Sequence, residues 1–402
     1  MGTINGTDSD KKFIMQHLND DVVQLALTQK KYAVNDWDFV LKQIASRQRA
    51  KDKLPSWYNN EHLLFPPEIS VEQSSSETTA QYKATLCTGN SLLDLTTGFG
   101  IDLLTMAPNF SIVYGVEPNS DLCNLVTANA NILKITQLKQ FNQTAEEFLL
   151  SESIKYVDWL YIDPSRRNAQ GNRVNIELYT PDIFALKKHF FKIADKILIK
   201  LSPMLDIKML LREFPECDKI HIVAVENECK EILLEIDTRN QITKNRIYKT
   251  INIKKRESEI FEFSADAEAE ALLILGTPEE GDFLYEPNAA IMKSGGYKTI
   301  TQQYKVFKIH KNSHLYISKE KIENFPGRRF QIFQIIENFR KENLKKALPQ
   351  NAYNLTVRNF PESADILKKR LKIHDGGNDF LFATTIAEEK HVLLCCRKYS
   401  EK

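Results

Sequence analysis

Short apolar segments alternate with longer amphipathic ones between residues 91 and 225, and this alternation constrains the fold more than any other feature of the sequence. The apolar segments have the length of buried strands, and they lie at 92–95, 111–116, 156–162, 196–201 and 220–225. The intervals between them have the apolar spacing of helices. Because strands that alternate with helices are typical of βαβ units, we predict an α/β domain with a parallel sheet.

The regions on either side of this sheet have different patterns. Residues 12–54 contain apolar positions at helical spacing, and Ser74 and Glu77 have the spacing of a capping box for a following helix. The sheet should end in β-rich hairpins at 231–236, 246–253 and 259–263. Turn-rich composition after residue 275 marks a further boundary. We therefore predict four regions: a helical region at 1–75, the sheet domain at 76–278, and two small mixed units at 279–324 and 325–402.

The composition limits the classes of protein to which the chain can belong. Apolar residues make up 42% and charged residues 27%, which excludes wholesale disorder. The net charge of +1 excludes a polycation that coats nucleic acid, so any attraction to phosphate must be local. No apolar run reaches the roughly 18–20 residues that span a bilayer. The first residues are polar, so we expect no signal peptide. Six scattered cysteines without a CxxC pair favour reduced thiols in a cytoplasmic protein.

The first candidate site is the segment at 93–102, where a strand ends in Asp94 and a turn with Gly98 and Gly100 leads into a helix that carries Asp102. Glycines let the backbone approach a ligand, and an open helix start offers N–H groups to polar ligand atoms. A dinucleotide-binding fold requires a third glycine, and this chain has Leu103 at that position. The two carboxylates would repel the pyrophosphate of a dinucleotide, whereas a carboxylate can pair with the cationic amino-acid end of S-adenosylmethionine. The segment therefore favours S-adenosylmethionine over NAD, with an ordinary glycine turn as the alternative.

Two further residues lie where the next strands should end. Glu117 comes 23 positions after Asp94, and a carboxylate about 20 residues beyond a glycine loop can accept both ribose hydroxyls. Thr144 falls where a third strand would end and could hydrogen-bond an adenine edge. A surface glutamate and a helix N-cap explain these two positions nearly as well.

The third signal is the strand at 159–162, which runs into Asp163-Pro164-Ser165-Arg166-Arg167. A carboxylate at this place lies at the carboxyl edge of the sheet, where open α/β sheets bind ligands. Proline presets a turn whose carbonyls can point at a substrate. Two adjacent arginines favour a clamp for phosphate or carboxylate over a solvated pair, although Asp163 could also cap the next helix.

Together, the segment from Asp94 to Asp102, Glu117 and the Asp163 motif resemble class I S-adenosylmethionine-dependent methyltransferases. The resemblance extends to the bacterial branch with a C-terminal THUMP-like domain, and the stretches that carry it are 72–83, 202–206, 226–231, 355–358 and 374–377. It implies a Rossmann-like sheet, mostly parallel with an antiparallel last strand, that holds S-adenosylmethionine. It also implies a ferredoxin-like unit at 279–324 and a THUMP-like domain at 325–402. True THUMP domains suggest RNA as the substrate.

On this resemblance we predict three groups of site residues. The catalytic residues are Asp163 and Pro164, whose carboxylate and carbonyl orient the attacking group. The cofactor residues are Asp94, Thr96, Gly98, Gly100, Asp102, Glu117 and Thr144. The substrate residues are Ser165, Arg166, Arg167 and Arg173. Enzymes that methylate exocyclic amines often have Asp/Asn-Pro-Pro and an aromatic residue, whereas this chain has Ser165 and Arg166 in the last two places. An arginine plane can stack on a base, so RNA stays the favoured partner.

Basic residues could extend such an RNA contact. The region 325–402 carries fifteen basic and nine acidic residues, and a second basic stretch surrounds residues 47–51. The candidates for phosphate contacts are Arg328, Arg329, Arg358, Arg370, Arg47, Arg49 and Lys51, with a solvated charged face as the equal alternative. Eight histidines without paired spacing predict no metal site. Two other functions stay open, an inactive RNA-binding or assembly protein and a methyltransferase for a protein or a small acid.

Overall fold

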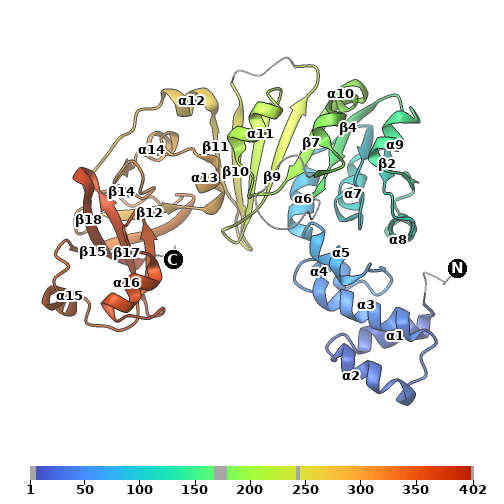
Figure 1. Ribbon diagram of the computed structural model, residues 1–402, viewed down its shortest axis with the longest axis horizontal. Helices are drawn as coiled ribbons and strands as arrows, with labels where there is room; N and C mark the ends of the chain where they lie inside the picture. The colour runs from blue at the N-terminus through green and yellow to red at the C-terminus, as the bar shows by residue number, and fades with distance from the viewer. Residues whose placement is uncertain (1–5, 167–178, 241–244, 400–402) are drawn as a thin grey trace. The chain divides into compact units, whose positions relative to one another are not determined.

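The computed structural model describes residues 6–166, 179–240 and 245–399, and the chain divides into two compact units. The first unit comprises Met1–Asp218 and Ile232–Thr243, and the second comprises Lys219–Glu231 and Lys244–Lys402. Figure 1 shows the helices and strands of both units, with labels where there is room. Among the described residues, no helix combines the length and the apolar character that crossing a membrane requires.

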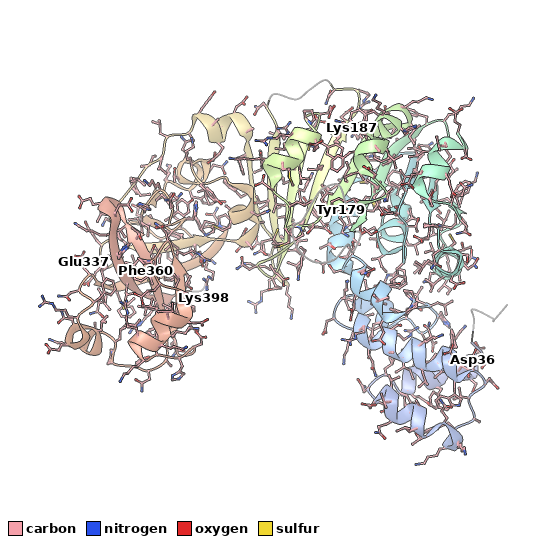
Figure 2. All side chains as sticks on the ribbon, viewed as in Figure 1. Asp36, Tyr179, Lys187, Glu337, Phe360 and Lys398 are labelled. Carbon is pink, nitrogen blue, oxygen red and sulfur yellow. The ribbon has the colours of Figure 1, made fainter. Side chains whose placement is uncertain are left out.

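The first unit begins with short helices, which Figure 1 draws in blue. They are α1 (Asp8–Gln16), α2 (Val22–Leu27), the 3-10 helix η1 (Gln29–Lys31), α3 (Trp37–Ala50), α4 (Pro55–Tyr58) and α5 (Glu68–Gln73). Asp36, labelled in Figure 2, caps α3 by accepting a hydrogen bond from the Phe39 amide at 2.9 Å. A small core holds these helices together, built from Ile14, Leu18, Leu25, Val40 and Ile44.

Six strands of the first unit are hydrogen-bonded in the order β9-β7-β4-β1-β2-β3. They are β1 (Ser91–Asp94), β2 (Ile112–Val116), β3 (Leu138–Phe141), β4 (Val157–Ile162), β7 (Ala194–Leu201) and β9 (Glu228–Asp237), of which β9 belongs to this unit from Ile232 on. The pairs from β7 to β3 are parallel, and β9 runs antiparallel to β7. The predicted α/β fold, mostly parallel with an antiparallel strand, is confirmed.

Helices connect these parallel strands, so the carboxyl ends of the strands meet at one edge of the sheet. The connecting helices are α7 (Ile101–Met106), η2 (Ala107–Asn109), α8 (Ser120–Ile132), α9 (Ala145–Leu150) and α10 (Ile183–Ile193). Helix α6 (Glu77–Leu86) precedes β1, and α11 (Ile207–Glu213) follows β7. A short antiparallel pair, β5 (Ser165–Arg166) and β6 (Tyr179–Thr180), follows β4.

The predicted capping box of α6 is wrong in its position. The N-cap is Ser76, whose hydroxyl accepts from the Thr79 amide at 3.2 Å, whereas Ser74 ends α5 and donates to the Val71 carbonyl. The three adjacent serines all have the chemistry of a cap, so spacing to Glu77 alone did not identify the right one.

The second unit begins with three strands, in which β10 pairs parallel with β8 and antiparallel with β11. They are β8 (Lys219–Val225), β10 (Ile247–Ile253) and β11 (Glu259–Ser264). Three helices follow in the chain, α12 (Ala265–Glu270), α13 (Ala289–Ser294) and α14 (Thr299–Tyr304). Aromatic residues from β11 pack with the next part of the unit in one buried cluster that includes Phe261, Phe263, Tyr285, Tyr316 and Phe325.

A seven-stranded sheet completes the second unit, in the order β13-β14-β12-β15-β18-β17-β16. Its strands are β12 (Phe283–Pro287), β13 (Phe307–Lys308), β14 (Tyr316–Ser318), β15 (Gly327–Ile336), β16 (Asn354–Arg358), β17 (Asp379–Ile386) and β18 (Lys390–Lys398). All neighbours are antiparallel except β16 and β17. The helices of this part are α15 (Lys341–Ala347), α16 (Ala364–Leu371) and η4 (Ala387–Glu389).

A buried carboxylate joins distant strands of this sheet. Glu286 in β12 is 3% exposed and accepts from Arg328 Nε at 2.5 Å and from an Arg358 Nη atom at 2.8 Å. Arg328 lies on the neighbouring strand β15, whereas Arg358 ends the edge strand β16. One carboxylate therefore connects β12 to a strand four places away in the sheet order.

Candidate cofactor and acceptor site

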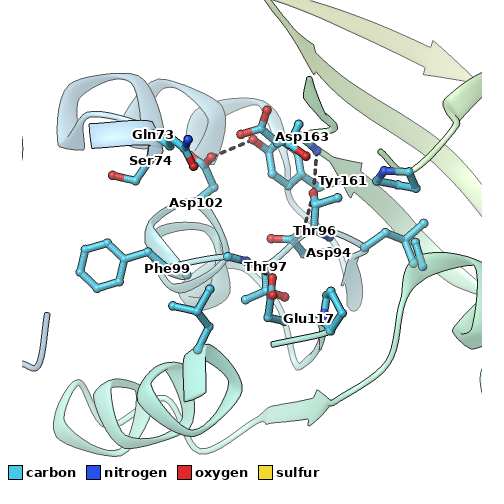
Figure 3. Close-up of a pocket in the computed structure, with 18 of the residues that line it drawn as sticks. Gln73, Ser74, Asp94, Thr96, Thr97, Phe99, Asp102, Glu117, Tyr161 and Asp163 are labelled. Atoms are coloured by element: carbon cyan, nitrogen blue, oxygen red, sulfur yellow. Dashed lines mark hydrogen bonds between the residues drawn. The ribbon is translucent and has the colours of Figure 1, made fainter. Parts of the chain in front are cut away.

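A pocket of about 640 Å³ opens in the first unit, at the carboxyl ends of β1, β2, β4 and β7. This is the edge at which open α/β sheets bind ligands. Figure 3 shows Asp94 and Thr96 near the centre of the pocket, with Asp163 on one side and Glu117 on the other. The lining includes Ser70, Gln73, Ser74, Ser75, Asp94–Asp102, Glu117, Pro118, Leu122, Thr144–Glu146, Tyr161, Asp163, Ser165, Thr180, Pro181 and Lys200.

The glycine turn after β1 forms one wall of the pocket. Gly98 and Gly100 have φ angles of +52° and +84°, in the left-handed region that other residues rarely adopt. A Cβ atom on Gly100 would lie 2.9 Å from Val126 Cγ2 of helix α8. The sequence therefore needs glycine at residue 100 for both backbone conformation and packing.

Glu117 ties this turn to the end of β2. Its Oε2 accepts from the Gly98 amide at 2.9 Å, and its Oε1 accepts from the Asn119 amide at 3.0 Å. The carboxylate is 8% exposed and lines the pocket. Each carboxylate oxygen has a second lone-pair direction, so Glu117 can still accept from two ligand hydroxyls.

Asp94 is the most deeply buried acid of the lining, at 1% exposed. Its Oδ1 accepts from the Thr96 amide at 2.8 Å. Burial raises the pKa of Asp94 well above its ordinary value, and the nearby charges of Asp102 and Asp163 add to the increase. A ligand cation placed beside Asp94 would favour its ionised form.

Asp102 is held inside the protein by three side chains. Lys83 Nζ from α6 lies 3.2 Å from its Oδ1, and its Oδ2 accepts from the Ser75 and Tyr161 hydroxyls at 2.7 Å and 2.8 Å. Burial would raise the pKa of Asp102, but the charges of Lys83 and Lys200 and the two hydroxyl donors outweigh burial and lower it. Asp102 therefore lines the pocket as a fixed carboxylate that already has partners.

Asp163 lies next to the glycine turn. Its amide donates to Thr96 Oγ1 at 2.7 Å, and its carboxylate forms an ion pair with Lys200 on the neighbouring strand β7. Among the described residues, Pro164 follows Asp163 but does not line the pocket, whereas Ser165 does. Arg166 belongs to β5, and the predicted substrate residues Arg167 and Arg173 lie outside the described residues.

Thr144 lines the pocket as the N-cap of α9. Its hydroxyl accepts from the Glu147 amide at 3.1 Å, and Glu147 Oε2 accepts from the Thr144 amide at 2.9 Å, which completes a capping box. This arrangement matches the alternative of a helix cap, and it leaves the Thr144 hydroxyl hydrogen available at the pocket wall.

The structure thus places all seven predicted cofactor residues on one pocket, together with Asp163 and Ser165. Four residues contribute to the site without having been predicted from the sequence, namely Ser75, Lys83, Tyr161 and Lys200. Lys200 could have been noticed as a charged residue within an apolar segment of the sequence. Its neighbours in the strand are buried, namely Ile197, Leu198, Ile199 and Leu201. No such signal existed for Lys83, whose partner comes from packing between α6 and α7.

The proposed phosphate contacts near the N-terminus are wrong in part. Arg47 is 2% exposed and donates to the carbonyls of Tyr58, Asn60, Glu61 and Leu63, so its guanidinium cannot reach a phosphate. Arg49 pairs with Glu68 and Glu72 at the surface. In the second unit, Arg370 pairs with Glu362, and Arg328 and Arg358 share Glu286.

Two family models match the chain in its second unit, a ferredoxin-like domain at residues 283–326 and a THUMP domain-like model at residues 327–398. The chain is also similar to a solved structure from Porphyromonas gingivalis W83, described as a "putative methyltransferase", with 30% identity, 98% coverage of each chain and a TM-score of 0.83. The chain therefore belongs to the same family as this protein, the methyltransferases with a C-terminal THUMP-like domain.

More distant solved structures match the chain in part. TrmK from M. capricolum, in complex with S-adenosyl-homocysteine, has 14% identity and a TM-score of 0.33, covering 41% of this chain and 70% of that one. An rRNA methylase from Streptococcus thermophilus has 12% identity and a TM-score of 0.30, covering 40% and 93%. A search of curated proteins finds no match. Among the described residues, no group of three or more His, Cys, Asp or Glu side chains could hold a metal ion.

Proposed function

We propose that the chain is an S-adenosylmethionine-dependent methyltransferase that holds its cofactor in the pocket of the first unit. The observation that carries this proposal is the convergence of Asp94, Glu117 and Asp163, from the ends of three different strands, on one pocket of about 640 Å³. S-adenosylmethionine has an ammonium, a sulfonium and two ribose hydroxyls, which are cations and donors that match carboxylate acceptors. A pyrophosphate would be repelled by the same set.

Each acidic residue fits a different part of this cofactor. Glu117 lies at the end of the strand next to the glycine turn, where a carboxylate can accept both ribose hydroxyls. Asp94 and the turn at 96–100 would surround the amino-acid end, and the raised pKa of Asp94 would fall when the ammonium arrives. Asp163 would then lie beside the methyl group that is transferred.

The chemistry would be direct displacement at the sulfonium methyl. The acceptor atom forms a bond to the methyl carbon, and the carbon–sulfur bond breaks with its electron pair remaining on sulfur. Most of the rate enhancement would come from holding the acceptor, the methyl carbon and the sulfur in line. Asp163 and the Pro164 carbonyl would position the acceptor group.

We propose RNA as the substrate. The THUMP domain-like match at residues 327–398 supports this choice, and so does the excess of basic over acidic residues in region 325–402. Contacts to phosphates make binding fall steeply with salt, so an RNA substrate predicts a strong salt dependence. Arg166, Arg167 and Arg173 would hold an anionic part of the substrate near Asp163.

Calorimetry with S-adenosylhomocysteine tests the cofactor proposal. We expect one saturable site, and about tenfold to hundredfold weaker binding for Asp94→Ala and Glu117→Ala, since each loses a hydrogen bond or ion pair to a charged group. Asp121→Ala is a matched control, because Asp121 is an exposed acid on α8 outside the pocket lining. Absence of binding heat in the wild-type protein would refute the proposal.

Labelled cofactor tests the substrate proposal. The pure protein is incubated with labelled S-adenosylmethionine and with total RNA or total protein from its own cell. Label in RNA supports the proposal, and the signal should decrease as salt increases. Label in protein or in small acids alone would identify a different class of substrate.

A further inference from the structure

Lys200 is the one lysine or arginine among the described residues that line the pocket, and its place in the sheet is unusual for a lysine. It lies near the end of β7, a strand whose other side chains from Ile197 to Leu201 are buried, and its own side chain is 15% exposed. Its ammonium forms an ion pair with Oδ2 of Asp163, and both residues line the pocket. The pocket that would hold a sulfonium therefore also contains an ammonium.

This ion pair changes what Asp163 can do for an acceptor. A carboxylate that positions a neutral exocyclic amine accepts the hydrogens of that amine with its oxygens. Here one of the two oxygens already accepts from Lys200. An ammonium near the acceptor also disfavours the positive charge that a neutral amine gains as it is methylated. Both effects disfavour an amine acceptor, whereas an acceptor that becomes negative would benefit from Lys200.

The aromatic residues of the pocket give a second, independent reason. An exocyclic amine of a base is usually presented by stacking the base on an aromatic ring or an arginine plane. Among the described lining residues, the aromatic ones are Phe99 and Tyr161. Phe99 packs against the rings of Trp57 and Phe65, and the Tyr161 hydroxyl is bonded to Asp102. Ser165 and Arg166 follow Pro164, so no aromatic residue comes next in the chain after Asp163 and Pro164.

We propose that the acceptor is a substrate hydroxyl and that Lys200 and Asp163 together activate its oxygen. This inference rests on the proposed methyltransferase function and names the class of acceptor. The free oxygen of Asp163 takes the hydroxyl proton while the acceptor oxygen forms its bond to the methyl carbon. The carbon–sulfur bond breaks, and its electron pair stays on sulfur to give the neutral thioether. Lys200 keeps its proton and donates a hydrogen bond to the developing negative oxygen, and Asp163 then releases the proton to water.

A purely structural ion pair is the alternative. Ile162 and Ile199 are register partners in the parallel pair of β4 and β7, so Asp163 and Lys200 are the next residues along two neighbouring strands. Opposite charges at such positions stabilise a sheet modestly. The two explanations differ in one property, because an ion pair that only joins the strands, away from the cofactor sulfur, would leave the affinity for a sulfonium unchanged when Lys200 is replaced.

The first experiment uses that property and needs no substrate. S-adenosylmethionine differs from S-adenosylhomocysteine by the positively charged methylsulfonium, so the ratio of their dissociation constants reports the field at sulfur. Lys200→Met removes a cation and leaves the Asp163 carboxylate unpaired. We expect the ratio to shift about fivefold or more in favour of S-adenosylmethionine. Lys200→Arg keeps the charge and should stay within twofold of the wild-type ratio.

Lys196→Met is the matched control. Lys196 lies on the same strand, is half-buried over the Trp159 ring, and is not part of the described pocket lining. The ratio of the two dissociation constants for Lys196→Met should equal the wild-type ratio. If Lys200→Met lowers the melting temperature too far for titration, Lys200→Gln provides the same charge change with a polar side chain. A ratio that changes less than twofold in the folded Lys200 variant would overturn the proposal.

The second experiment identifies the methylated atom. Labelled RNA from the transfer assay is digested to nucleosides, and the methylated product is separated as an O-methyl or an N-methyl nucleoside. An O-methyl product that Lys200→Met reduces at least tenfold supports the proposal. An N-methyl amine product overturns it while the methyltransferase function stands. Failure of the wild-type protein to bind either cofactor form would instead refute the proposed function itself.

Discussion

The buried ion pair of Lys83 and Asp102 gives the sharpest test of the forces that shape the pocket. Lys83 is 0% exposed, and the Asp102 side chain is 9% exposed. Lys83→Met removes the ammonium and leaves Asp102 with the hydroxyls of Ser75 and Tyr161 as hydrogen-bond donors. Removing one partner of a buried pair typically costs about 3–5 kcal/mol. Because two donors remain, we expect a loss near the lower end, about 3 kcal/mol.

A double-mutant cycle separates the ion pair from simple packing. Asp102→Asn alone leaves the Lys83 ammonium buried and should cost about 3 kcal/mol. The double variant removes both charges, so its cost should fall short of the sum by about 2 kcal/mol or more. Tyr161→Phe is the control for a single hydrogen bond to a charged group, and we expect it to cost about 1.5 kcal/mol.

Tryptophan fluorescence during urea unfolding provides the assay. The three tryptophans of the chain, Trp37, Trp57 and Trp159, all belong to the first unit, so their signal reports the unit that contains the ion pair. A loss below about 1 kcal/mol for Lys83→Met, or additive losses in the double variant, would refute the reasoning. The lowered pKa of Asp102 adds a pH signature. Its stabilisation is present above the unfolded pKa of about 4 and is lost as the pH falls through the lower folded pKa.

Three further predictions concern other parts of the molecule. The raised pKa of Asp94 means that an ammonium ligand must displace a proton, so cofactor affinity should increase as the pH rises towards that pKa. Calorimetry in buffers of different ionisation enthalpy measures this proton release, because the binding heat then depends on the buffer. The same buffer dependence for the wild-type protein and Asp94→Asn would contradict the prediction. Gly100→Ala should lower stability by about 1–3 kcal/mol because its Cβ would lie 2.9 Å from Val126 Cγ2. In Gly98→Ala the atom nearest to the new Cβ would be the Thr96 carbonyl oxygen at 3.8 Å, an ordinary contact, so the loss should be only about 1 kcal/mol. Thermal unfolding compares the two, and equal losses would count against the contact with Val126. Glu286→Ala leaves the guanidiniums of Arg328 and Arg358 without their shared carboxylate. We expect the second unit to lose about 2 kcal/mol, less than for a fully buried pair, because the two arginine side chains are 35% and 40% exposed. S-adenosylhomocysteine binding is the control for that variant, and a weaker affinity would contradict the assignment of the pocket to the first unit.

The sequence predicted the parts of the fold that depend on local pattern. The apolar run at 156–162 corresponds to β4 (Val157–Ile162), and the run at 196–201 lies within β7 (Ala194–Leu201). Except for Asp102, which lies in the first turn of α7, each predicted cofactor residue lies at or just after the end of a strand or in the loop that follows it. Because parallel strands end at the same edge, their position in the chain was enough to predict that they line one pocket.

The sequence did not predict contacts that depend on packing between elements. Lys83 and Asp102 meet because α6 packs on α7, and no spacing rule relates the two residues. Arg47 lies in a basic stretch that resembles a solvated surface, yet four backbone carbonyls far from it in sequence surround its guanidinium. Burial lowers the pKa of Arg47 to about 10, a cost that only those tertiary contacts can offset.

The Glu286 cluster bears on how the second unit can be divided experimentally. The two family matches meet between residues 326 and 327, but β12 on one side is hydrogen-bonded along its length to β15 on the other. A fragment that starts at residue 327 would lose that neighbouring strand and the acid shared by Arg328 and Arg358, and it would expose a bare sheet edge to aggregation. The two matched domains therefore share one sheet, and we expect a soluble piece for binding studies to need all of β12 as well as residues 327–398.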